Sequence, residues 1–331
     1  MIVKTLHTPG ERGTLPNTPD LPPFDATLLA SQRPDLHLCA VSDAEIVEAQ
    51  ASLWWTNSPR YGSQRVGVIG HYASASDEAA ARLLAAALGV LAEQGCTLAI
   101  GPMDGNTWRR YRFVVEAGGE PPFFLEPTNA PEWPTQWQRA GFTPFAQYVS
   151  ALNSDLTQKD SRVLRVAVRM DRLGVRIRAI RLPELQTDLV RIYRLSQVAF
   201  AHNFLYTELP QADFLAQYEK IVPYLRPELL LLAERGNDLV GFTFAIPDLA
   251  QAARGEPIDT FLLKTLAILP DPALAGLGAL MAERVQQEGS RLGFRRCIHA
   301  LMHEKNVSLN TSLRYGSVMR RYALFSREIA Q

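Results

Sequence analysis

The stretch from residue 261 to residue 316 limits the possible folds most. It predicts an apolar strand, a glycine turn, a long helix, a second strand and a short helix that starts at an asparagine. The first strand is predicted over residues 261–268, and Gly276 and Gly278 stand at the start of the long helix. Two glycines at such a junction expose backbone N–H groups, and the helix dipole adds positive potential. The stretch therefore predicts an anion site suited to a pyrophosphate, with close packing of the glycines as the structural alternative.

Bulk composition excludes several classes of protein. The chain has 331 residues, with 34 basic and 34 acidic side chains, so its overall charge does not call for nucleic acid or an acidic membrane. No apolar run approaches the roughly 18 residues of a membrane span. The cysteines, Cys39, Cys96 and Cys297, are odd in number and widely spaced, which argues against a disulfide framework or a metal pair. We expect a soluble cytoplasmic protein that holds no metal.

The length favours more than one domain, and the sequence divides accordingly. Residues 1–35 are rich in proline and predict an extended lead, residues 36–150 a first domain, 151–165 a linker, and 166–331 a second domain. Late strands of the first domain are predicted at 123–125 and 145–151. A strand, a helix and a second strand recur in both domains, and strand end to helix-stop glycine spans 23 residues from Tyr72 to Gly95 and 24 from Leu269 to Gly293. This spacing indicates an internal repeat.

The order of elements in residues 170–331 resembles that of the GNAT acetyltransferase superfamily, and residues 36–150 resemble a degenerate copy of it. The resemblance to tandem GNAT proteins implies an α/β fold with two GNAT-like domains. Each would have a splayed, mostly antiparallel mixed sheet flanked by helices. It also implies that acyl-CoA lies in the splay, with its pyrophosphate on the turn before the long helix. Gly276 and Gly278 match the family's Gln/Arg-x-x-Gly-x-Gly/Ala pattern, whereas Ala273 replaces its basic or amide residue.

The resemblance also names residues that would touch the cofactor. Asn306 matches a family position that contacts the CoA arm, although its residue type also suits a helix N-cap. The first copy has Ser74–Glu78 in place of the glycine turn, with acids near the anion position, and we expect it not to hold CoA. The expected contacts to acetyl-CoA or another acyl-CoA are Ile268, Ala275, Gly276, Leu277, Gly278, Ala279 and Asn306.

Acyl transfer from a thioester to an amine needs a neutral amine, a polarised carbonyl and a proton for the leaving thiolate. The family often supplies the proton from a tyrosine four residues before a late glycine. Here that glycine is Gly316 and the residue at the tyrosine position is Ser312, so the usual acid is missing or moved. Tyr315 is the candidate acid, with a packing role as the alternative.

The candidate bases are His303, Glu304 and Glu234, with His299 as a further histidine near the same strand end. On a regular strand, His299 and His303 share a face and lie about 13 Å apart, too far to share a metal ion. For each candidate, a solvated or packed role is the alternative.

These features lead us to expect an N-acyltransferase that uses acyl-CoA, with acetyl-CoA as the expected donor, and has one site in the second domain. Its acceptor would be a small-molecule amine or a peptide, and a homodimer is compatible with the sequence. A non-catalytic acyl-CoA-binding sensor or scaffold is the first alternative, favoured by Ala273 and Ser312. The second alternative resembles aminoacyl-tRNA-dependent ligases, in which the arginine run over residues 162–181 would meet RNA; the balanced charge argues against it.

Overall fold

One continuous sheet runs through the whole molecule. A computed structural model describes residues 1–219 and 221–330, and within them a 13-stranded sheet has the order β1-β2-β3-β4-β5-β13-β7-β12-β11-β10-β9-β8, with β6 beside β13. The strands are β1 (Ile2–Leu6), β2 (Leu36–Val41), β3 (Val47–Trp54), β4 (Val66–Ser74), β5 (Leu98–Gly101), β6 (Phe113–Glu116), β7 (Thr143–Asn153), β8 (Val175–Ala179), β9 (Leu231–Arg235), β10 (Asp238–Pro247), β11 (Thr260–Ile268), β12 (Arg296–His303) and β13 (Ser317–Glu328). Most pairs are antiparallel, and β4–β5 and β11–β12 are parallel.

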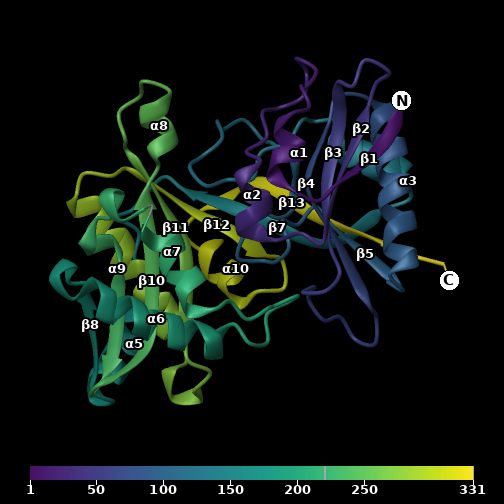
Figure 1. Cartoon of the computed structure of the whole chain (residues 1–331). Helices are drawn as coiled ribbons and strands as arrows, with labels where there is room; N and C mark the ends of the chain where they lie inside the picture. The colour runs from purple at the N-terminus through teal and green to yellow at the C-terminus, as the bar shows by residue number, and fades with distance from the viewer. Residues whose placement is uncertain (220, 331) are drawn as a thin grey trace.

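The strand order has a pseudo-twofold arrangement. Strands β1 to β5 form one half of the sheet and β8 to β12 the other, in mirrored order about the central pair β13–β7. The two halves exchange their final strands. Strand β13 ends the C-terminal part of the sequence but pairs with β5 of the N-terminal half, and β7 ends the N-terminal part but pairs with β12 of the C-terminal half. Figure 1 shows β13 crossing from the C-terminal half, so that both chain ends lie on the N-terminal half. The predicted repeat is therefore a repeat of the fold.

Helices cover the sheet on both sides. They are α1 (Pro9–Gly13), α2 (Thr27–Gln32), α3 (Asp77–Glu93), α4 (Trp133–Arg139), α5 (Ser161–Arg172), α6 (Leu185–Ala199), α7 (Gln211–Glu219), α8 (Leu249–Ala253), α9 (Leu277–Arg291) and α10 (Val307–Ser312). In the C-terminal half, α6 and α7 share a hydrophobic core with one face of the sheet, and α5 and α9 share a second core with the other face. Helix α9 forms because Leu277, Met281 and Val285 recur every four residues and are fully buried.

The expectation of an unpacked lead over residues 1–35 is wrong. Strand β1 pairs with β2, and α1 and α2 follow it before β2 begins. The segment packs because Leu6, Leu21 and Leu29 are buried, and because Pro9 lies in the first turn of α1, where proline is tolerated. The lead therefore supplies the edge strand of the N-terminal half, as β8 does in the C-terminal half.

Two further expectations need correction. Residues 123–125 form no strand; Pro121 and Pro122 precede them, and Phe123 and Phe124 instead pack into a core of the C-terminal half. The expected linker over residues 151–165 is largely structured, because β7 continues to Asn153 and α5 begins at Ser161. The proposed domain limits stay a prediction, since β7 and β13 cross between the halves.

Candidate functional site

The C-terminal half contains a splay between two parallel strands. Strands β11 and β12 pair only from Thr260–Arg296 to Leu263–His299, after which β12 pairs with β7 alone. The register between β10 and β11 shifts beside Lys264, which is left opposite no partner, as in a β-bulge. His299 is thus the last residue of β12 that is paired with β11.

The N-terminus of α9 follows β11 and begins at an exposed glycine. Gly276 precedes the helix with φ 83°, a left-handed conformation that favours glycine, and no side chain in the described part of the chain caps the helix. No acidic residue stands in its first turn, and both Ala275 and Gly276 are exposed. The first N–H groups of a helix have no partner within it. Those of Leu277, Gly278 and Ala279 therefore have no partner within α9 and, among the described residues, no side-chain cap.

A basic side chain reaches this turn from another element. Arg169 of α5 donates a hydrogen bond to the carbonyl of Ala275, and its Nη2 lies 3.8 Å from the position a Cβ on Gly276 would take. Three other arginines of the run over residues 162–181 have acidic partners: Arg162 pairs with Asp160, Arg178 with Asp188 and Glu234, and Arg181 with Glu184. Arg169 therefore places a positive charge where Ala273 supplies none.

The equivalent helix end in the N-terminal half, the N-terminus of α3, is capped and acidic. Ser76 caps α3 by accepting from the N–H of Ala79 at 3.2 Å, and Asp77 and Glu78 stand in the first turn. Asp77 also forms an ion pair with Arg139 of α4. The positive end of α3 is thus already balanced by the chain's own carboxylates.

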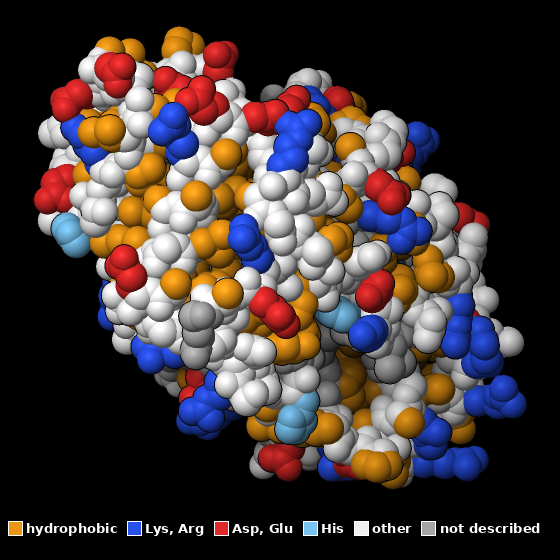
Figure 2. Space-filling view, turned by 90° about the vertical axis from the view of Figure 1, so that its right-hand side faces the viewer, with side chains coloured by type: hydrophobic (Ala, Val, Ile, Leu, Met, Phe, Trp, Pro, Cys, Tyr) orange, Lys and Arg blue, Asp and Glu red, His pale blue; other side chains and the backbone are white. Residues whose placement is uncertain are grey.

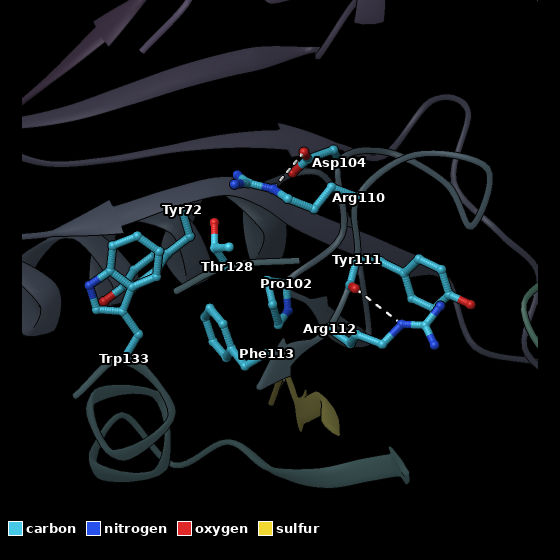
Figure 3. Close-up of a pocket in the computed structure, with 9 residues that line it drawn as sticks. All are labelled: Tyr72, Pro102, Asp104, Arg110, Tyr111, Arg112, Phe113, Thr128 and Trp133. Atoms are coloured by element: carbon cyan, nitrogen blue, oxygen red, sulfur yellow. Dashed lines mark hydrogen bonds and ion pairs between the residues drawn. The ribbon is translucent and has the colours of Figure 1, made fainter. Parts of the chain in front are cut away.

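The splay between β4 and β5 is also nearly filled. A hollow of ≈ 10 Å³ remains there, about the space of one water molecule. Figure 3 shows Tyr72, Phe113 and Trp133 around it, with Thr128 beside them. The ring of Tyr72 lies 5.4 Å from that of Trp133 and 6.0 Å from that of Phe113. Aromatic packing therefore takes the volume that the splay would otherwise offer.

Comparison with solved structures is informative, whereas no protein-family profile matches the sequence and no curated protein matches it significantly. A tandem GNAT protein from the clavulanic acid biosynthesis pathway matches 100% of this chain and 99% of its own, with 13% identity and a TM-score of 0.51. This chain has the tandem GNAT fold. A GCN5-related N-acetyltransferase from Sphaerobacter thermophilus matches 89% of the chain and 81% of its own at 12% identity and a TM-score of 0.51.

Another similar structure is a GCN5-related glucosamine N-acetyltransferase region in a fungal multi-domain GH3 β-N-acetylglucosaminidase, at 14% identity and a TM-score of 0.55. The match covers 88% of this chain, and the chain spans 33% of that larger protein. At these identities the likeness concerns the fold. We refer below to the two halves as the N-terminal and C-terminal GNAT copies.

The histidines of β12 do not share a face, so that expectation is wrong. Leu301 has φ 60° and the register with β7 shifts between His299 and Met302, so a bulge inserts one residue between the histidines. His299 then contacts Ser312, whereas the ring of His303 lies 4.9 Å from that of Tyr148.

Three of the predicted catalytic residues lie apart from one another. The Tyr315 hydroxyl is buried and donates to Glu283 of α9 at 3.1 Å, and burial raises its pKa. Glu234 accepts from Arg178 and from Arg191 at 2.6 Å, and these partners lower its pKa despite some burial. Glu304 is exposed. The catalytic roles of these residues and of His303 stay predictions.

The predicted cofactor residues are grouped more closely. Ile268 ends β11, and residues 275–279 form the turn and first turn of α9. Asn306 is exposed and directly precedes α10. Within the described residues, three observations fit acyl-CoA in this copy: the uncapped helix, the adjacent Arg169 and a buried imidazole nitrogen of His299 without a partner. Among the described residues, no group of His, Cys, Asp and Glu could hold a metal, and no helix is long and apolar enough to cross a membrane.

Residues 117–126, which we call the strap, were missed as a site element. The strap leaves the N-terminal copy and crosses the C-terminal one, where its ends are held by Arg320 of β13. This arginine donates from Nε to the Ala117 carbonyl at 2.6 Å and from Nη1 to Glu126 at 2.5 Å. Between them, the N–H of Phe124 donates to Asp248 at 2.7 Å. The only sequence signal was the run of apolar residues after two prolines.

Lys264 was also missed. Its Nζ donates to the strap carbonyl of Leu125 at 3.2 Å. The surrounding burial, followed by the charge of Arg112, lowers the pKa of Lys264 to about 7. Burial also lowers the pKa of His303, and the charges of Lys305 and Arg112 act in the same direction while Glu304 opposes them. Lys264 and His303 are therefore both weakly basic groups held near Arg112.

Proposed function

We propose that this protein is an N-acyltransferase that uses acyl-CoA, most simply acetyl-CoA, and that its working site is in the C-terminal GNAT copy. The observation that carries the proposal is the uncapped, glycine-started N-terminus of α9, which contrasts with the capped and acidic N-terminus of α3. A helix end with free N–H groups and no acid attracts a phosphate, and one with two carboxylates repels it.

Separate groups of residues would bind the cofactor and transfer the proton. Gly276 to Ala279 would hold the pyrophosphate through backbone N–H groups, and Arg169 would add a charge-assisted contact. The bound thioester supplies an activated acyl carbon. On the α6–α7 face of the splay, His303 or Lys264 would accept the proton that an amine loses, since burial lowers the pKa of each and so favours its neutral form. Glu234 is a weaker base because two arginines hold it ionised.

Isothermal titration of the full chain with CoA and acetyl-CoA tests the cofactor. Arg169→Glu is expected to weaken binding on the order of tenfold, about 1.4 kcal/mol. Arg176→Glu is the matched control, because Arg176 is an exposed arginine of β8, at the far edge of the sheet, and the charge change is the same. Equal affinity of the two variants, or no binding at millimolar CoA, would refute the proposed site.

The reaction itself is tested by thiol release. Acetyl-CoA is incubated with a panel of small primary amines and peptides, and free thiol is followed with a chromogenic reagent. We expect release with at least one acceptor and its loss in Arg169→Glu at low acetyl-CoA. Figure 2 shows acidic and basic side chains on the face it presents, with hydrophobic ones between them, which is a poor surface for RNA there.

One observation favours a second function, acyl-CoA binding without transfer. The strap packs Phe123 and Phe124 into the core on the α6–α7 face of the C-terminal copy, the side from which an acceptor would approach. The buried ion pair between Arg320 and Glu126 holds the strap in place on this face. Tight CoA binding with no thiol release across the amine panel would support this alternative.

A further inference from the structure

A buried imidazole lies at the point where β11 and β12 part. His299 is 3% exposed, and its Nδ1 lies 2.6 Å from the hydroxyl oxygen of Ser312, at the end of α10. Its other nitrogen, Nε2, is buried and has no hydrogen-bond partner among the described residues. An unsatisfied buried polar group costs about 1–3 kcal/mol, and such groups in native proteins often have a functional reason.

The partners of His299 determine which nitrogen carries the proton. The Ser312 hydroxyl lies within reach of two acceptors, His299 Nδ1 and Met302 Sδ at 3.1 Å. An imidazole nitrogen accepts a hydrogen bond more strongly than a thioether sulfur does. The hydroxyl therefore donates to Nδ1, and the ring proton is on Nε2. Burial lowers the pKa of His299 to about 4, so the ring is neutral near pH 7.

Ser312 stands at the position where GNAT proteins often have a tyrosine that acts as the general acid. The nearby Tyr315 does not offer a free hydroxyl, because it donates to Glu283. A buried N–H donor therefore lies at the residue where β11 and β12 part, in a copy that lacks the expected hydroxyl donor. We propose that His299 Nε2–H hydrogen-bonds the sulfur of CoA in the C-terminal GNAT copy, and that Ser312 is a positioning residue that fixes the tautomer. This inference rests on the function proposed above.

The chemistry balances without a charged histidine. As the C–N bond to the acceptor amine forms and the thioester C–S bond breaks, the electron pair stays on sulfur. The Nε2–H group stabilises that negative charge by a hydrogen bond and keeps its proton. The proton that completes the thiol is the one the amine loses. A neutral imidazole held by Ser312 serves this purpose, because a fixed dipole needs no reorganisation during the reaction.

The test uses ¹⁵N-histidine NMR on the full chain, with His299 assigned from His299→Gln. We compare CoA with desulfo-CoA, which has no thiol. The proposal expects the Nε2 resonance of His299 to move with CoA and to move much less with desulfo-CoA, although both ligands bind. Wild type is expected to bind CoA at least threefold more tightly than desulfo-CoA, and His299→Leu to lose that preference. Ser312→Ala should keep desulfo-CoA affinity while the His299 signals change to a mixture of tautomers.

The outcomes separate this inference from the proposed function. If both ligands bind and the His299 signal responds equally to each, or to neither, the sulfur contact is wrong and the proposed function stands. If neither ligand binds wild type, both are wrong. Because the main readout is on wild type, a variant that fails to fold does not remove the test. The exposed His202 is an internal control whose signal should not respond.

Discussion

Lowering the pH from 7 to 5 is expected to remove about 2 kcal/mol of unfolding free energy for each of two histidines in the N-terminal GNAT copy. His37 and His71 are almost fully buried, and their Nδ1 atoms lie 2.7 Å and 2.9 Å from the same hydroxyl oxygen, that of Ser52. One hydroxyl can donate to one ring and accept from the other, so both rings are neutral. A proton on either ring would break this arrangement.

The magnitude follows from the pKa values. Burial lowers the pKa of His37 to about 3, with smaller effects from His71 and Arg12. Burial likewise lowers the pKa of His71 to about 4, although Asp104 acts in the opposite direction. An unfolded histidine titrates near 6.5. Between about pH 6.5 and 4 the unfolded chain therefore binds more protons than the folded chain, so the unfolding free energy decreases as the pH is lowered. At about 1.36 kcal/mol per pH unit, the fall from 6.5 to 5 gives about 2 kcal/mol each.

Urea unfolding at pH 7, 6 and 5 provides the measurement. Every variant shares the carboxylates that also titrate in this range, so differences between variants isolate the histidine. His71→Gln cannot gain the proton, and its unfolding free energy should fall by about 2 kcal/mol less than that of wild type between pH 7 and 5. His202→Gln removes an exposed histidine and should follow wild type. Equal pH slopes for His71→Gln and wild type would show that His71 is not held neutral by burial.

Three other predictions concern a buried ion pair, the exchanged strand β13 and the buried cysteines. Glu126→Gln should cost about 3–5 kcal/mol in urea unfolding because it leaves Arg320 buried without its carboxylate, whereas replacing both by apolar residues should cost less. A chain that ends before β13 should lose cooperative unfolding of both copies by calorimetry, since β13 lies between β5 and β7; an intact N-terminal transition would contradict this. The three cysteines are buried and free, and burial raises the pKa of each thiol. They should react with a thiol reagent at pH 8 only in denaturant, and rapid reaction of the folded chain would be unexpected.

Local patterns in the sequence predicted the parts of the candidate site that depend on neighbours along the chain. The helix from Leu277 and the strand before it follow from apolar periodicity, and the turn follows from a glycine at Gly276, where φ is positive. The acidic first turn of α3, which argues against an anion site there, was also readable from Asp77 and Glu78 alone. The pairing of His299 with Ser312 did not, because it joins a strand and a helix end through a bulge that no local pattern marked.

The sequence by itself determined the tandem GNAT order of elements and the glycine turn before α9, because short-range propensities and spacing decide helices, strands and turns. Only the tertiary structure decided which last strand completes which copy, where the strap lies, and which face His303 occupies. It also placed Arg169 of α5 beside Gly276, where its positive charge replaces the one that Ala273 does not supply. These features depend on contacts between residues far apart in the chain, and a one-residue bulge at Leu301 is enough to reverse a side chain.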